Sequence, residues 1–305
     1  MQRYEFQVDA AGSGMRIDLF LTGQMEGQSR SYVQKLLKQD HVRVNGLAVP
    51  GSYKVRPGDT ISLMLPDPVE PAACARPIEL DILYEDEDVI LINKPKGMVV
   101  HPAAGHEEDT LVNGLMYHCQ GQLSGINGVL RPGIVHRIDK DTTGVLVACK
   151  NDQAHASLAG QLKEHTITRR YLAVVHGCLR EDEGTVDAPV GRNERDRVRM
   201  AVNERHGKRA VTHYRVRERF RDFTWIECRL ETGRTHQIRV HMSYMGHPLL
   251  GDTLYGPAKP PYALEGQTLH AAVLGFIHPA TGEYMEFEAP LPDYFAQLLE
   301  KLRRR

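Results

Sequence analysis

A turn of mixed charge leads directly into an apolar run in the stretch GIVHRIDKDTTGVLVACK, residues 133–150. Within it, Asp139 follows Arg137 by two residues and directly precedes Lys140. The hydroxyl of Thr143 is also close in sequence. Neighbouring cations and hydrogen-bond donors favour the charged form of a carboxyl, so this acid is expected to stay ionised well below neutral pH. An ionised carboxylate suits a nucleophile or a counter-ion rather than a proton donor.

Asp141 supplies a second carboxylate two residues after Asp139. On an extended backbone the two acids would share a face, as in the acid and nucleophile pair of a glycosidase. Carboxylates this close in sequence rarely lie on opposite sides of a bond to be cleaved, which counts against that hypothesis. A polar turn held only by ion pairs is a further, purely structural interpretation of the same residues.

A second stretch, LETGRTHQIRVHM at residues 230–242, alternates apolar and polar residues. Such alternation is typical of a half-buried strand, in which Ile238 faces the core and Arg239 the opposite side. The pattern therefore predicts a strand from which Arg239 meets a carboxylate across a sheet. An exposed polar face is the alternative.

Two more stretches join a charged turn to an apolar run, NKPKGMVVHP at residues 93–102 and TRRYLAVVHG at residues 168–177. The sequence contains no GxSxG, GxxxxGK or HExxH motif, and no GxGxxG follows a predicted strand, so the enzyme classes that use them are disfavoured. Fifteen histidines raise the question of a metal. Pairs such as His236 and His241 lack cysteine or acid partners at metal-binding spacing, so we expect no metal.

The composition is that of an ordinary globular protein, with 305 residues, 41% hydrophobic and 25% charged. No apolar run approaches the length of a membrane-spanning helix, and the first residues lack the pattern of an export signal. We therefore expect a cytoplasmic protein of two domains without membrane contact. The five cysteines are widely spaced and never form a CxxC pair, which predicts reduced thiols.

Residues 1–66 are expected to form a small domain of two helices and a hairpin. RIDLFL and SRSYVQKLLKQD have helical spacing, and Asn45-Gly46 is a tight-turn signal between two short strands. Between Gln28 and Arg56 the segment carries six basic residues and one acid, which predicts a basic surface. The proline-rich residues 67–78 are interpreted as a linker.

Residues 79–305 are expected to form one large domain. Apolar runs such as DVILINKP, YLAVVHG and TWIECRL are short and rich in β-branched residues, whereas TLVNGLMYHC and NDQAHASLAGQLKEH have helical spacing. Strands outnumber helices and do not alternate regularly with them. This pattern favours a mixed α+β domain over a doubly wound parallel sheet.

Charge is unevenly distributed, although the formal net charge is only -1. Residues 192–221 carry eleven lysines or arginines and four acids, whereas residues 79–89 carry six acids and no base. Basic stretches of this kind are typical of surfaces that contact nucleic acid. The alternative is a solvated surface without a partner.

The stretches NKPKGMVVHP, HRIDKDTTG, RRYLAVVHG and ETGRTHQIRVH resemble the ribosomal large-subunit pseudouridine synthases of the RluA/RluD type. Ile138 stands where leucine is commoner in that family and Thr143 where serine is commoner, and both differences are conservative. Residues 14–63 resemble the S4-like RNA-binding domain that precedes the catalytic domain in many of these enzymes.

This resemblance implies a pseudouridine synthase fold with a mixed, largely antiparallel sheet, preceded by a small α/β RNA-binding domain. It also implies that the protein isomerises specific uridines in RNA, with 23S large-subunit ribosomal RNA as the expected substrate. The glycosidic bond breaks, the base turns, and it is rejoined through carbon without metal or cofactor. We expect a monomer with RNA as its partner.

The resemblance also implies roles for single residues. Asp139 matches the catalytic aspartate, which attacks the sugar or the base, and Arg239 matches the basic residue that pairs with it. Tyr171 matches the aromatic residue that stacks on the uracil.

Four further residues are expected to bind the substrate. Arg137 would enter the gap left by the extruded nucleotide, since an enzyme that acts on a base must take it out of the stack. Ile238 would pack against the base. His136 and Thr143, which belong to the motif around the aspartate, are expected to contact the substrate too.

A non-catalytic RNA-binding factor in ribosome assembly is the alternative from another class. It would share the basic surfaces, but it offers no reason for Asp139, Tyr171 and Arg239 to occur together. A glycosidase would instead require both Asp139 and Asp141.

Overall fold

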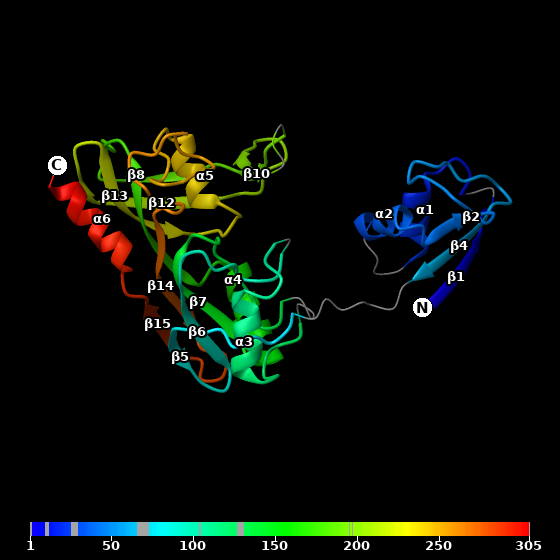
Figure 1. The fold of residues 1–305 in the computed structure, drawn as a ribbon, viewed down its shortest axis with the longest axis horizontal. Helices are drawn as coiled ribbons and strands as arrows, with labels where there is room; N and C mark the ends of the chain where they lie inside the picture. The colour runs from blue at the N-terminus through cyan, green and yellow to red at the C-terminus, as the bar shows by residue number, and fades with distance from the viewer. Residues whose placement is uncertain are drawn as a thin grey trace. The chain divides into compact units, whose positions relative to one another are not determined.

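The computed structural model of the protein describes residues 2–304 apart from residues 10–11, 26–29, 66–72, 104, 127–130, 195 and 197. The chain divides into two compact units, Met1–Pro71 and Ala72–Arg305 (Figure 1). Half of the predicted linker, residues 67–72, lies outside the described residues. Ala73 is buried in the core of the second unit, and the amide of Arg76 donates to the carbonyl of Asn113. Residues 73–78 therefore run along the second unit.

The N-terminal unit contains the two predicted helices and the predicted hairpin. Its elements are β1 (Gln2–Gln7), α1 (Ile17–Gln24), α2 (Arg30–Lys38), β2 (Val42–Val44), β3 (Leu47–Ala48) and β4 (Thr60–Leu65). The strands form an antiparallel sheet in the order β1-β4-β2-β3. Asn45 and Gly46 both have positive φ, 50° and 83°, as a tight hairpin turn requires. Leu21, Val33 and Ile61 pack in a core that belongs to this unit alone.

Asp18 joins the two helices of this unit through a buried carboxylate. Its side chain is 0% exposed. It accepts hydrogen bonds from the Nε of Arg16 at 3.0 Å, from the Nη2 of Arg30 at 2.9 Å and from the Nε2 of Gln34 at 2.8 Å. The hydrogen bond from Arg16 is the largest cause that holds the pKa of Asp18 well below its usual range. The charged carboxylate therefore ties α1 to α2.

The substitution Asp18→Asn is expected to destabilise the N-terminal unit by about 2 kcal/mol at pH 7, because the hydrogen bonds from Arg30 and Gln34 lose a charged acceptor. A lowered pKa stabilises the fold above the unfolded value of about 4, and this contribution is lost as the pH falls through the folded value. Hydrogen exchange of residues 17–24 in the full chain would measure the change. The variant and the wild type should converge in acid, and an equal difference at pH 7 and pH 2 would contradict this account.

The C-terminal unit is built on one large sheet. Its strands are β5 (Ile82–Glu85), β6 (Val89–Lys94), β7 (Thr143–Cys149), β8 (Thr168–His176), β9 (Glu183–Asp187), β10 (Val190–Arg192), β11 (Met200–Val202), β12 (Val211–Arg219), β13 (Phe223–Leu230), β14 (Leu269–Ile277) and β15 (Tyr284–Glu288). Its helices are α3 (Leu111–Cys119), α4 (Asp152–Lys163), α5 (Gln237–Tyr244) and α6 (Asp293–Arg303).

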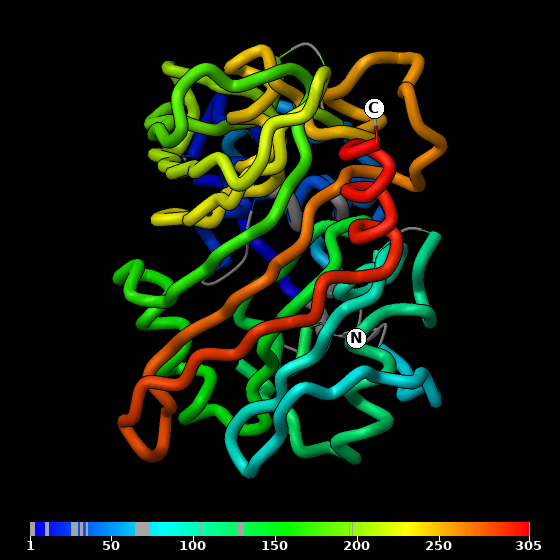
Figure 2. The backbone as a smooth tube through the Cα atoms, turned by 90° about the vertical axis from the view of Figure 1, so that its left-hand side faces the viewer, coloured from blue at the N-terminus to red at the C-terminus, as the bar shows by residue number. Residues whose placement is uncertain are grey.

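Within the described residues the large sheet has the order β5-β6-β7-β14-β8-β13-β12-β9, and β15 lies along β14 (Figure 2). Among the strand pairs that the structure describes in this sheet, only that of β7 with β14 is parallel. The remaining strands, β10 and β11, form a separate antiparallel ribbon. The predicted mixed, largely antiparallel α+β fold is therefore confirmed.

The central strand β14 fixes the distance between β7 and β8. Ala271 of β14 pairs with Gly144 of β7 on one side and with Tyr171 of β8 on the other. Gly144 has a φ of 107°, and a Cβ atom there would lie 2.1 Å from the carbonyl oxygen of Ala271, so only glycine fits. The loop that precedes β7 is thereby held beside Tyr171.

Helices cover both faces of the centre of the sheet. Leu111 and Leu115 of α3 pack with Leu146 of β7 in one core, and Leu158 of α4 packs with Val147 of β7 in another. Because β7 lies between these cores, all seven of its residues are buried. This explains why its sequence is a continuous apolar run rather than an alternating one.

The predicted strand over residues 230–242 is wrong, because strand β13 ends at Leu230 and residues 237–244 form helix α5. The alternation arises because different partners bury successive residues of the helix. Ile238 and Met242 pack in the core that includes Tyr171, whereas Val240 packs with Val190 of β10. The polar residues Gln237, Arg239 and His241 are buried too, and the side chain of each makes hydrogen bonds inside the protein.

None of the helices in the described part of the chain combines the length and the apolar character needed to cross a bilayer.

Candidate active site

A cavity opens where the loop before β7, strand β8 and helix α5 meet. Its lining residues are Arg137, Ile138, Asp139, Thr142, Tyr171, Leu230, Arg234, His236, Gln237, Ile238, Arg239 and Leu269. All three residues that the sequence predicts as catalytic line this cavity. Arg137 and Ile238 from the predicted substrate-binding set line it as well.

Asp139 lies at the charged end of the cavity, and Arg239 holds one of its oxygens. The Nη1 of Arg239 donates to the Oδ2 of Asp139 at 2.9 Å, across 100 residues of sequence. The Nε and Nη2 of the same guanidinium donate to the two oxygens of Asp252 at 2.7 and 2.9 Å. Arg239 thus bridges a fully buried carboxylate and one that is 17% exposed.

These contacts keep Arg239 and Asp252 charged although both are buried. Burial alone would lower the pKa of Arg239, but the hydrogen bond and charge of Asp252 and the charge of Asp139 raise it above its ordinary value. Burial would raise the pKa of Asp252, but Arg239 and the backbone amides of Leu254 and Tyr255 hold it below the ordinary value. The arginine is therefore a fixed cation whose third donor points into the cavity.

Lys94 supports the loop that carries Asp139. Its side chain is fully buried, and its Nζ donates to the carbonyl oxygens of Pro95, Met98 and Lys140 at 2.8 to 2.9 Å. Burial lowers its pKa to about 7, although the charges of two nearby acids oppose this. Because Lys140 directly follows Asp139, the third hydrogen bond fixes the backbone beside the carboxylate.

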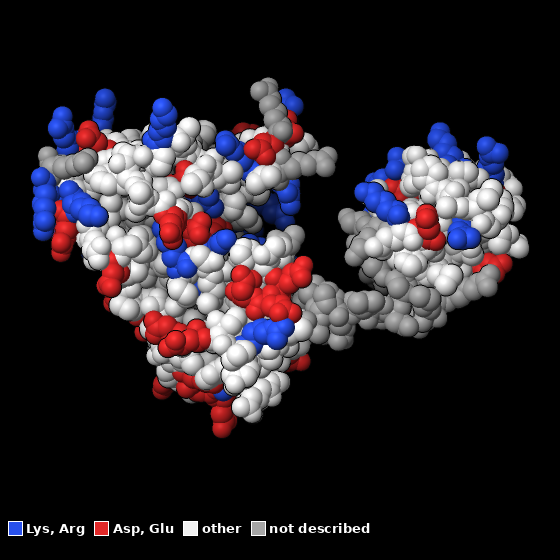
Figure 3. Space-filling model, viewed as in Figure 1, with Lys and Arg blue, Asp and Glu red and all other residues white. Residues whose placement is uncertain are grey.

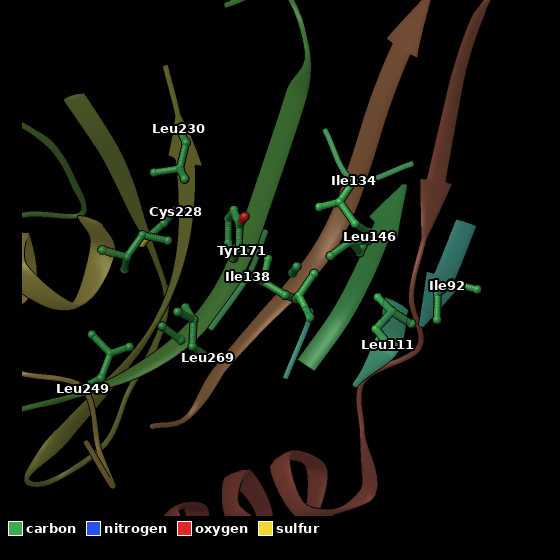
Figure 4. Packing of buried hydrophobic residues seen from close by; sticks show 14 of the residues in the cluster. Ile92, Leu111, Ile134, Ile138, Leu146, Tyr171, Cys228, Leu230, Leu249 and Leu269 are labelled. Carbon is green, nitrogen blue, oxygen red and sulfur yellow. The ribbon is translucent and has the colours of Figure 1, made fainter. Parts of the chain in front are cut away.

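The lining of the cavity also includes apolar side chains and the ring of Tyr171. Tyr171 is 9% exposed and packs in the same core as Ile138, Leu230 and Leu269 (Figure 4). Burial is the largest cause that raises the pKa of its phenol, so the hydroxyl stays protonated at neutral pH. A flat apolar surface next to a carboxylate can hold a planar base by stacking while the carboxylate attacks.

His136 and Thr143, the other two predicted substrate-binding residues, do not line this cavity. The Nε2 of His136 accepts a hydrogen bond from the amide of Val147 at 3.1 Å. Burial lowers the pKa of His136 to about 4. The Oγ1 of Thr143 lies 2.9 Å from the Nδ1 of His270. The structure therefore places both side chains in contacts of β7 rather than in the cavity.

Asp141 does not line the cavity either. Its carboxylate lies against Gly266, where a Cβ atom would come within 2.5 Å of its Oδ2. The two carboxylates of a glycosidase are therefore not both present in the cavity.

No role at this site was predicted from the sequence for four residues, Lys94, His236, Asp252 and Tyr255, although Lys94 and His236 lie within the quoted stretches. Asp252 is a single acid in the stretch PLLGDTLYG, and its position between apolar residues and glycines is the only signal it gives. Tyr255 lies in the same stretch, and the guanidinium carbon of Arg239 is 5.1 Å from the centre of its ring.

The basic run over residues 192–221 lies beside acids from other segments of the chain, which offset part of its charge. Arg209, Arg215, Arg217 and Arg219 form ion pairs with acids of neighbouring segments. Arg195 and Arg197 lie outside the described residues. In the view of Figure 3, lysines and arginines still gather over the upper part of the C-terminal unit, and acids over the part below it.

Comparison with known proteins shows the families that the two units match. Residues 88–244 match the RNA pseudouridylate synthase family, and residues 15–61 match the S4 domain family. An uncharacterised RNA pseudouridine synthase of Bacillus subtilis, YlyB, is 59% identical over 95% of this chain and 94% of its own. Ribosomal large subunit pseudouridine synthase D of Zymomonas mobilis is 48% identical over 95% of this chain and 94% of its own.

Among solved structures, human RNA pseudouridylate synthase domain containing 1 is similar to this fold, with a TM-score of 0.57. It shares 26% sequence identity, and the match covers 79% of this chain and 98% of the human chain. The fold is therefore that of the RNA pseudouridylate synthases. The chain belongs to the RNA pseudouridylate synthase family and carries an S4 domain at its N-terminal end.

Proposed function

We propose that this enzyme isomerises uridine to pseudouridine in large-subunit ribosomal RNA, with Asp139 as its nucleophile. The observation that carries the proposal is that one carboxylate, held by a buried arginine, and the ring of Tyr171 line the same cavity. The substrate class is supported by the relatives of comparable length that are named ribosomal large subunit pseudouridine synthase D.

Asp139 is in position to act on a uridine stacked against Tyr171. Its Oδ2 is occupied by Arg239, so Oδ1 is the oxygen free to attack the sugar or the base. The bond between N1 and the ribose is broken, and the base turns and is rejoined through carbon five. The hydrogen at carbon five is released to solvent as a proton, N1 takes up a proton in its place, and the bond to Asp139 is broken in the course of the reaction.

The polar and the apolar residues of the cavity would contact different parts of the RNA. Arg137 is exposed at the mouth of the cavity and would occupy the gap left by the extruded nucleotide. Ile238 and the other apolar residues of the wall would pack against the base. The non-catalytic alternative accounts for none of this arrangement, because RNA binding alone does not require a carboxylate and a buried arginine in one cavity.

The S4 domain would supply contacts to phosphates away from the target uridine. Lys38, Arg43, Lys54 and Arg56 are exposed on the N-terminal unit. Such contacts raise affinity without regard to sequence and weaken as the salt concentration rises. The enzyme would act as a cytoplasmic monomer whose partner is RNA.

Deletion of residues 1–71 is expected to weaken binding to ribosomal RNA by about 10- to 100-fold at moderate salt and to reduce the salt dependence of binding. The rate constant of a single turnover at saturating RNA should stay within about threefold of the wild type, because every residue of the cavity lies in the other unit. Filter binding at several salt concentrations and single-turnover kinetics would measure both. A collapse of the saturated rate would show that the S4 domain takes part in the chemistry.

The direct test of the proposed function is release of tritium from carbon five of uridine in labelled large-subunit ribosomal RNA. The wild type should release tritium, and mapping of the product should place pseudouridine at a small number of positions. Binding without any release, on both free RNA and assembly intermediates, would instead favour the assembly factor.

A further inference from the structure

His236 is a cavity residue to which the proposed function gives no task. It directly precedes helix α5, and its φ of 57° lies in the left-handed region. Residues other than glycine occupy this region at a cost, and such strain is often found at functional sites. The side chain is 19% exposed and points to Asp139, with 3.8 Å between its Nε2 and the Oδ1 of that residue.

The other ring nitrogen of His236 contacts the hydroxyl of Tyr255, which accepts a hydrogen bond from the backbone. The Nδ1 of His236 lies 2.9 Å from the hydroxyl oxygen of Tyr255, and this hydroxyl accepts a hydrogen bond from the amide of Met200 at 2.9 Å. Among the described hydrogen bonds of Tyr255, only the contact with His236 can use the proton of the hydroxyl. When Tyr255 donates this proton to Nδ1, the proton of the neutral imidazole is on Nε2, the nitrogen that faces Asp139.

The two oxygens of Asp139 consequently have different environments. Oδ2 is fixed by the guanidinium of Arg239 at 2.9 Å, whereas Oδ1 faces the Nε2–H of His236 at 3.8 Å. This second distance is too long for a hydrogen bond. Contacts of catalytic groups are often long in the free enzyme and shorten when the substrate binds.

We propose that His236 is a positioning residue, whose neutral Nε2–H group holds the Oδ1 of Asp139 in the direction of attack when RNA is bound. The inference rests on the proposed function, since it assumes that Asp139 attacks a uridine. The imidazole keeps its proton throughout, and Tyr255 keeps the imidazole in the required tautomer. Strand β11, which contains Met200, supports the hydroxyl of Tyr255 and so takes part in this arrangement.

Protonation of His236 would disrupt this arrangement, because Nδ1 would no longer accept from Tyr255. Burial is the largest cause that lowers the pKa of His236, and the charge of Asp139 opposes it. The neutral form is therefore favoured at physiological pH. The charged and titratable groups around the ring are Asp139, Arg239, Asp252, Arg137 and Tyr255.

The experiment compares His236→Ala with His236→Gln in single-turnover tritium release at saturating ribosomal RNA. The alanine variant should be slower than the wild type by about 10- to 100-fold, because the attacking oxygen is less well oriented. The glutamine variant should stay within about fivefold of the wild type, because its amide nitrogen can donate from the position of Nε2. Affinity for RNA should change less than about threefold in both variants.

The pH profile adds a result that a purely structural role would not produce. The wild-type rate should fall on the acid side with an apparent pKa below 6.5, the ordinary value for histidine. The glutamine variant should lack this fall because its amide does not titrate. Glutamine and alanine variants that are equally slow although both are folded would overturn the proposal, as would an alanine variant with the wild-type rate.

Two further variants keep the test decisive. Tyr255→Phe removes only the hydroxyl and is expected to be slower by about 3- to 10-fold, which tests the tautomer even if His236→Ala does not fold. His118→Ala is the matched control, because His118 of helix α3 pairs with Glu85 of strand β5 outside the cavity, and its rate should equal that of the wild type. A wild type that releases no tritium would refute the proposed function, whereas an active wild type and an equally active His236→Ala would refute only this inference.

Discussion

The substitution Asp139→Asn is expected to lower the single-turnover rate of pseudouridine formation by at least about a thousandfold, because an amide oxygen is a far weaker nucleophile than a carboxylate. The amide oxygen can still accept the hydrogen bond from Arg239, so the fold should be preserved. Affinity for ribosomal RNA should therefore stay within about threefold of the wild type. Tritium release and filter binding on the same preparation would measure the two effects separately.

Asp141→Asn is the matched control for this prediction. Asp141 lies two residues away and carries the same charge, but its carboxylate is outside the cavity. Its rate should stay within about threefold of the wild type. An active Asp139→Asn variant would remove the nucleophile from the proposal, and an inactive Asp141→Asn variant with a normal fold would reopen the hypothesis of a carboxylate pair.

The substitution Arg239→Gln is expected to have the largest effect on stability, about 3–5 kcal/mol at pH 7. It leaves the carboxylate of Asp252 fully buried without a counter-ion. It also releases Oδ2 of Asp139, so the rate should fall by about a hundredfold or more. Trp225, the single tryptophan of the chain, lies in β13, so its fluorescence during urea denaturation reports on the C-terminal unit.

The cause of this loss of stability can be tested with a second substitution and by changing the pH. Adding Asp252→Asn to Arg239→Gln removes the unpaired buried charge, so the double variant should recover part of the stability. The pKa of Asp252 is lowered in the folded wild type, so its contribution is present above about pH 4 and is lost as the pH falls through the folded value. The difference between Arg239→Gln and the wild type should therefore shrink in acid.

Arg170→Gln provides the comparison with a surface ion pair. Arg170 pairs with Glu286, and both side chains are more than one third exposed. Such pairs contribute about 0 to 1 kcal/mol. A loss from Arg239→Gln no larger than that from Arg170→Gln would show that the buried bridge is not the source of stability.

Much of the site could be predicted because its residues lie in short motifs of unusual composition. Asp139 was indicated by the cations around it, and Arg239 was expected to meet a carboxylate. That contact is present, but Arg239 projects from a helix rather than from a strand. The predicted contact of Arg239 with a carboxylate is present although the predicted strand is wrong, because the contact was inferred from charge and the strand from periodicity.

The rest could not be predicted because it depends on contacts between distant segments. Asp252 becomes important only when α5 brings Arg239 to it, and nothing in its local sequence shows that it is buried. Likewise, the arginines of β12 look like a nucleic-acid surface until the sheet places Asp182, Glu183 and Glu227 beside them. A local pattern records which charges a segment has, and the fold decides which of them are neutralised.

The position of β14 in the sheet has a consequence for the order in which the protein matures during translation. Tyr171 and the loop of Asp139 are joined through Ala271, which belongs to a strand near the C-terminal end of the chain. A nascent chain that has not yet reached residue 277 therefore lacks the strand that unites the two halves of its proposed active site. The N-terminal unit, which has its own core, is synthesised first. A growing chain would thus gain the means to hold RNA before it gains the means to modify it.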